Sequence, residues 1–123
     1  MSLKLLFRIL AAILTLNALG LLFATSTFLG MAGFTESPSL ITLGQGFGVM
    51  VLSLAIIHWR IPDIASSVMP AFGKLAAIIV SLNVLLVLYH TVTGQISGAI
   101  AYSNLIVLVV LAVLFFMYSR KSA

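Results

Sequence analysis

Four continuous apolar stretches, each about as long as a membrane-crossing helix, run through the 123-residue chain. A helix needs roughly 20 apolar residues to cross a hydrocarbon core about 30 Å thick. The apolar runs do not alternate with a period of two, which argues against transmembrane strands. The expected spans are residues 5–28, 40–59, 72–92 and 99–118. We therefore expect an all-α membrane protein, one integral domain over residues 1–123 with four transmembrane helices in a bundle.

The low charge content supports the same class. Hydrophobic residues make up 63% of the chain and charged residues 7%, whereas about a quarter of a typical soluble domain is charged. So few charges cannot solvate the surface of a soluble monomer, and so apolar a chain is not disordered. Cysteine is absent, which excludes a disulfide scaffold and Cys-ligated metals.

The basic residues predict one orientation in the membrane. In a four-span topology all six fall on the same side, whereas Glu36 falls in the first connection, on the other side. Cytoplasmic segments carry the excess of lysine and arginine, so both termini and the middle connection are expected in the cytoplasm. The charges also favour contacts with anionic lipids and do not form a nucleic-acid patch. They are Lys4, Arg8, Arg60, Lys74, Arg120 and Lys121.

An offset of 66 residues aligns the first span with the third. The alignment pairs Arg8 with Lys74 and Asn17 with Asn83, and several threonines also match. It suggests two parallel-repeat αα-hairpins related by an axis along the membrane normal. The alternative is that apolar helices simply resemble one another.

Uncharged amides are the polar groups expected at mid-span. No Asp, Glu, Lys or Arg lies near the middle of a span, which disfavours proton pumps, ion-coupled transporters and voltage sensors. Asn17 and Asn83 each lie about ten residues into a span, near the bilayer midplane. They either form interhelical hydrogen bonds that fix packing or line a polar path.

Two histidines are candidate cofactor ligands. His58 is expected near the cytoplasmic end of the second span and His90 near the outer end of the third. A rise of 1.5 Å per residue separates them by roughly 25 Å in depth, so one chain cannot use both on one metal or haem. Each alone could bind a haem or chlorophyll through a neutral imidazole nitrogen. The alternative is that both belong to interfacial belts, beside Trp59 and Tyr89.

Glycines in the second span are candidate packing residues. Gly44 and Gly48 have the i, i+4 spacing that produces a flat face and permits close approach of another helix. Gln45, between them, is expected in the outer leaflet with Tyr89, His90, Tyr102 and Asn104. These polar side chains either converge on an outward pocket or are scattered.

Together, Asn17, the glycines of residues 44–48, His58-Trp59 and the turn of residues 94–98 give the chain a recognisable pattern. It resembles a family of uncharacterised small bacterial four-helix inner-membrane proteins. The resemblance implies a multi-pass protein of the bacterial inner membrane. Members often carry an arginine in the glycine-rich span, where this chain has Gln45. The family has no established activity, so the resemblance transfers no catalytic or binding residue.

Three functions are compatible with these features. The first is an accessory or structural subunit that packs within a larger membrane complex, for instance an energy-converting one, beside lipids and other subunits or copies of itself. The second is a small homo-oligomeric channel or carrier for a neutral solute. The third is a subunit that binds a haem or chlorophyll through one histidine. An enzyme is not expected, because the sequence shows no acid–base pair, nucleophile or metal-ligand spacing.

Overall fold

The computed structural model describes residues 1–121. Within them the chain is helical, with no strand, and four helices are long and apolar enough to cross a membrane. The prediction of an all-helical chain with four such helices is confirmed. The elements in chain order are α1 Leu3–Phe23, α2 Thr25–Met31, α3 Pro38–Ile64, the 3-10 helix η1 Ser66–Val68, α4 Met69–Val92 and α5 Ala99–Lys121.

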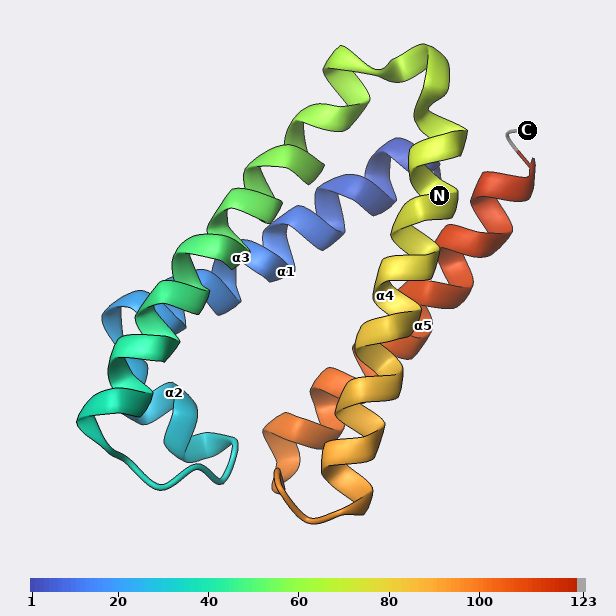
Figure 1. Ribbon diagram of the computed structural model, residues 1–123. Coiled ribbons are helices and arrows are strands. Elements are labelled where there is room, and N and C mark those ends of the chain that lie inside the picture. The colour runs from blue at the N-terminus through green and yellow to red at the C-terminus, as the bar shows by residue number, and fades with distance from the viewer. Residues whose placement is uncertain (122–123) are drawn as a thin grey trace.

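The long helices are arranged as two pairs. Helix α1 packs along α3, and α4 packs along α5, with far fewer contacts between the pairs. The start of α1, the end of α5 and the α3–α4 connection lie at one end of the molecule, hereafter the terminal end (Figure 1). The α2–α3 and α4–α5 connections lie at the other, hereafter the loop end.

The hydrophobic core lies toward the terminal end, where the two pairs converge (Figure 1). Phe7 of α1 is fully buried and meets Phe115 of α5 edge-on, with ring centroids 5.1 Å apart. Ile61 from α3 and Val80 from α4 complete a cluster to which all four long helices contribute. Aromatic pairs in this geometry stabilise a core beyond the area they bury. This cluster is the main junction between the pairs.

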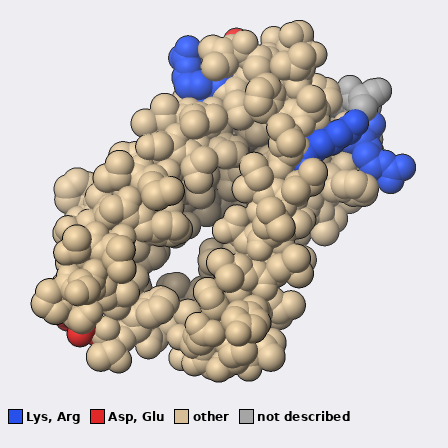
Figure 2. Space-filling model, viewed as in Figure 1, with Lys and Arg blue, Asp and Glu red and all other residues tan. Residues whose placement is uncertain are grey.

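Beyond the core the two pairs diverge and then meet again at the loop end. The Ser97 N–H donates a hydrogen bond to the Ala32 carbonyl over 3.4 Å, which joins the two connections. Gly33 and Gly98 beside this contact have φ of 90° and 96°, which a side chain would strain. Between the two junctions, Figure 2 shows an opening through the molecule.

The first apolar run, expected as one helix over residues 5–28, is divided at Ala24 into α1 and α2. The Thr25 hydroxyl donates to the Leu21 carbonyl over 2.5 Å, a type of bond that bends helices. The ring of Phe28 occupies the space that a Cβ at Gly20 would need. A glycine at position 20 thus lets α2 fold back against α1.

Helix α3 is longer than the span expected over residues 40–59. Ser37 caps its start by accepting a hydrogen bond from the Leu40 N–H, and Pro38 occupies the first turn, where no N–H is needed. At the other end the helix continues through Pro62 to Ile64. Asp63 in this last turn forms an ion pair with Arg8 of α1, which anchors the extension to the neighbouring helix.

Candidate functional site

A charged and aromatic cluster joins α1 to α3 at the terminal end. Nη2 of Arg8 lies 2.9 Å from both carboxylate oxygens of Asp63. The Arg8 guanidinium carbon also lies 4.2 Å from the centre of the Trp59 ring, within the range of a cation–π interaction. Arg8 and Asp63 are 55 positions apart in the sequence, so no local pattern indicates this ion pair.

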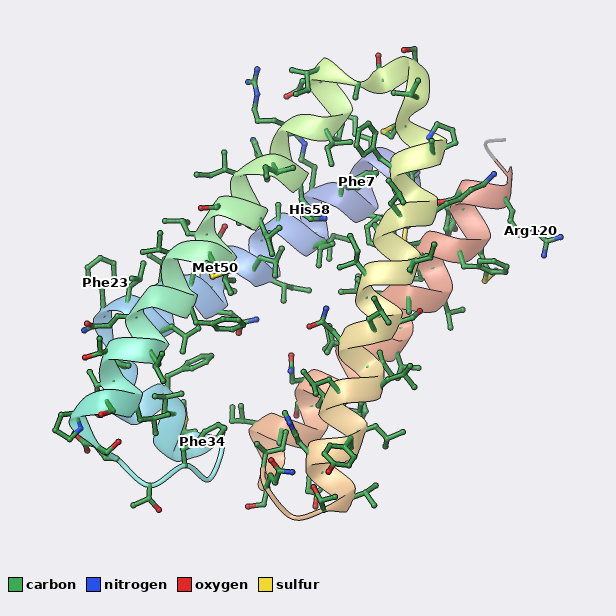
Figure 3. The ribbon with its side chains drawn as sticks, viewed as in Figure 1. Phe7, Phe23, Phe34, Met50, His58 and Arg120 are labelled. Atoms are coloured by element: carbon green, nitrogen blue, oxygen red, sulfur yellow. The ribbon has the colours of Figure 1, made fainter. Side chains whose placement is uncertain are left out.

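His58 lies buried between α3 and α1, close to the core (Figure 3). Its Nδ1 is 2.7 Å from the Leu54 carbonyl, one turn earlier, so the tautomer with a proton on Nδ1 donates there. The ring centroid lies 6.0 Å from that of Phe7. With 9% of its surface exposed, His58 has room for a haem or chlorophyll plane only if α1 moves away.

His90 lies at the loop end, in the last turn of α4 and away from His58. Its ring is half-buried and tilted against that of Tyr89, with centroids 5.9 Å apart. Its carbonyl accepts hydrogen bonds from the N–H groups of Gln95 and Ile96, which close the helix. Within residues 1–121 no three His, Cys, Asp or Glu residues lie close enough to hold a metal ion.

Small residues form the face of α3 that packs against α1. Gly44, Gly48 and Ala55 are buried along this face. A Cβ at Gly48 would lie 3.0 Å from Leu22 Cγ and one at Gly44 would lie 3.2 Å from Leu29 Cδ1. Both distances are shorter than ordinary carbon–carbon contact. The absence of a side chain at these two positions therefore permits the observed closeness of α3 to α1 and α2.

The two mid-helix asparagines occupy equivalent positions. Asn17 follows the start of α1, Leu3, by the same number of residues as Asn83 follows the start of α4, Met69. Asn83 is exposed, and its Nδ2 donates to the Ile79 carbonyl over 2.9 Å. Asn17 is half-buried, and among the described residues its amide has no hydrogen-bond partner. The two amides do not bond to each other.

Gln45 lies at a separate cavity, of about 340 Å³, where the α1–α2 break faces α3. Thr25, Ser26 and Thr27 line it together with Gln45. The Ser26 hydroxyl donates to Glu36 Oε1 over 3.0 Å nearby. The polar side chains expected together in the outer leaflet therefore do not all meet in one pocket. Gln45 faces the α1–α2 break, whereas His90 lies in the last turn of α4.

Comparisons with protein-family models, with curated proteins and with solved structures return no match to this chain. The resemblance to short bacterial four-span proteins stays a prediction. The functional conclusion therefore depends on the geometry described above.

Proposed function

We propose that the protein is an accessory subunit of a larger complex in the bacterial inner membrane, where it packs against the transmembrane helices of other subunits. Its body consists almost wholly of membrane-length helices, at most 33% buried over any span. The described residues offer no cluster of groups for metal chemistry. Such a chain acts chiefly by packing against helices and lipids.

The observation that carries this proposal is that the mid-helix amides lack hydrogen-bond partners on other helices. Asn17 has no partner within the described chain, and exposed Asn83 uses one N–H on its own helix. Hydrocarbon cannot satisfy the remaining donors and acceptors, and each unsatisfied group in lipid costs several kcal/mol. A helix from another subunit can supply the missing partners. We therefore place the contact on the exposed faces of α1 and α4.

The charges support an orientation with both termini in the cytoplasm. Lys4 and Arg8 lie in the first two turns of α1, Arg60 and Lys74 flank the α3–α4 connection, and Arg120 lies in the last turn of α5. All belong to the terminal end of the molecule, whereas Glu36 belongs to the loop end. The positive-inside bias then assigns the terminal end to the cytoplasm.

A four-helix bundle of two parallel repeats explains the pairing of the helices. Helices α1 and α4 begin at Leu3 and Met69, which are separated by the same 66-residue offset that aligns Asn17 with Asn83. Each of these helices packs chiefly against the next long helix in the chain. Each helix pair presents one mid-helix amide, Asn17 on α1 and Asn83 on α4, which suits a partner with a helix beside each pair.

Purification in mild detergent at native expression, with an absorption spectrum on the same sample, tests the proposal. We expect one or more membrane proteins to co-purify in a defined ratio. Replacing both amides, Asn17→Leu with Asn83→Leu, should lower partner recovery about eightfold, because an interhelical hydrogen bond contributes roughly 0.6 kcal/mol. The matched control, Gln45→Leu, removes an exposed amide elsewhere and should leave recovery unchanged.

Three outcomes would contradict this function. Migration as a lone small oligomer without a co-purifying protein would overturn it. Solute flux in proteoliposomes that is lost in the double variant would favour a channel or carrier for a neutral solute. A Soret or chlorophyll band that disappears with His90→Ala would favour a cofactor-binding subunit.

A further inference from the structure

A second surface cavity, of about 620 Å³, follows the α4–α5 pair. We call it the α4–α5 groove. Its walls are mainly large apolar side chains, and two basic side chains, Lys74 and Arg120, line it as well. The principal apolar lining residues are Ile78, Leu82, Leu85, Val113 and Phe116.

Helical spacing explains the shape of the α4–α5 groove. On α4, Lys74, Ile78 and Leu85 are separated by whole turns and form one stripe. From Lys74 to Leu85 this stripe extends roughly 16 Å at 1.5 Å per residue, close to half of the roughly 30 Å hydrocarbon core. The α4–α5 groove therefore has the length of one membrane leaflet.

The charges gather at one end of this groove because the two helices are antiparallel. Lys74 lies in the second turn of α4, and Arg120 lies in the last turn of α5. The Arg120 guanidinium carbon lies 5.5 Å from the centre of the Phe116 ring, so the charge sits over an apolar wall. Figure 3 shows the Arg120 side chain extending outward from the end of α5.

No acidic side chain of the chain neutralises these two cations. The sequence has two acidic residues. Asp63 is paired with Arg8, and Glu36 lies at the loop end beside Ser26. Within residues 1–121 neither cation has an ion-pair partner. An apolar groove one leaflet long with two such cations at one end is complementary to a lipid that carries a phosphate.

We propose that the α4–α5 groove binds an anionic phospholipid of the cytoplasmic leaflet. One acyl chain lies along Ile78, Leu85 and Val113, and the headgroup phosphate lies between Lys74 and Arg120. The inference rests on the membrane orientation in the proposed function and is independent of the protein partner. Arginine and lysine recognise such headgroups by charge-assisted hydrogen bonds and by attraction to the negative surface of the leaflet.

The test is native mass spectrometry of the full chain, purified in mild detergent and titrated with phosphatidylglycerol or phosphatidylcholine. We expect the wild-type chain to retain one phosphatidylglycerol in preference to phosphatidylcholine. Lys74→Gln with Arg120→Gln should lower phosphatidylglycerol affinity about 30-fold, because each basic side chain near the headgroups contributes roughly fivefold. The matched control, Lys4→Gln with Arg60→Gln, removes the same charge outside the groove and should change affinity less than about twofold.

A second variant tests the apolar part of the site. Val113→Trp fills the slot, leaves both cations in place, and should lower retention of both lipids. Equal retention of the two lipids by the wild-type chain would overturn the proposal, as would equal losses in the test and control double variants. Unchanged retention in Val113→Trp would overturn the placement of the acyl chain. The assay uses isolated chain, so its result is independent of whether a protein partner co-purifies.

Discussion

Ser119 illustrates how tightly single atoms are fitted where α5 meets α4. Its side chain is fully buried, and within the described residues its Oγ is the one buried side-chain polar atom without a hydrogen-bond partner. It faces Gly73 of α4, where a Cβ would overlap the hydroxyl. The helices approach here because position 73 lacks a side chain, and the serine hydroxyl is left unsatisfied.

Ser119→Ala should stabilise the protein. A buried hydroxyl without a partner costs about 1–3 kcal/mol, and alanine removes it without adding volume. We expect the free energy of unfolding to rise by about 1 kcal/mol and Tm in detergent to rise by about 3 °C. Ser103→Ala, an exposed position on the same helix, should leave Tm unchanged. A lower Tm for Ser119→Ala would show that the hydroxyl has a stabilising partner.

At the scale of elements, glycines decide how closely α3 packs against α1. Gly48 lies against Leu21 and Leu22, with 3.0 to 3.3 Å between its hypothetical Cβ and their side-chain atoms. Gly46, half a turn away, would have no atom within 4 Å of a Cβ. The two positions share one helix and one residue type but differ in their surroundings.

Gly48→Val should therefore destabilise the chain whereas Gly46→Val should not. A valine at position 48 must push α1 away, which costs about 2 kcal/mol, as overpacking commonly does. At position 46 the same change adds only a helix-propensity gain of a few tenths of a kcal/mol. Equilibrium unfolding in mixed detergent micelles measures both. Equal stability of the two variants would contradict the packing of α1 against this face.

The elements show what could be predicted from the sequence. The four long helices were predictable because length and apolarity alone determine whether a helix can cross a membrane. The break at Ala24 was not, because it depends on the ring of Phe28 lying over Gly20. The extension of α3 through Pro62 was also missed, since it is anchored by Asp63 pairing with a distant arginine.

Placement of the candidate site residues was predictable only in part. Depth along a helix follows from residue number, so the separation of His58 from His90 was accessible from the sequence. The burial of His58 against Phe7 was not, because it depends on which face α3 turns toward α1. Likewise, periodicity places Lys74 above Ile78 on α4, but only the antiparallel packing of α5 brings Arg120 to the same groove.

At the scale of the whole molecule, the two helix pairs are joined at both ends and separated between them (Figures 1 and 2). The terminal end has the aromatic and aliphatic core, with Phe7 against Phe115. The loop end has the contact between Ala32 and Ser97. The helix pairs therefore contact each other least midway between the terminal end and the loop end.

An engineered disulfide tests the junction at the loop end. The chain has no native cysteine, so Ala32→Cys with Ser97→Cys introduces a single pair. Backbones joined by a hydrogen bond lie close enough for a disulfide, and we expect rapid crosslinking under mild oxidant. Ala32→Cys with Ser66→Cys pairs opposite ends of the molecule and should remain reduced. Absence of crosslinking in the first variant, measured by thiol alkylation, would show that the loop end is apart.

The two junctions between the helix pairs differ in extent, because the terminal end has the packed core whereas the loop end has the Ala32–Ser97 hydrogen bond. A small rotation of one pair at the terminal end therefore produces a larger displacement at the loop end. A helix of 20 residues is about 30 Å long, so a rotation of about 5° at the packed end displaces the far end by about 3 Å. The Ala32–Ser97 hydrogen bond is already 3.4 Å long, beyond the usual N–H···O range, so a displacement of this size along the bond would break it. We therefore expect a small change in the crossing angle beside Phe115 to displace the loop end, and a fluorophore pair placed across the loop end would measure that displacement.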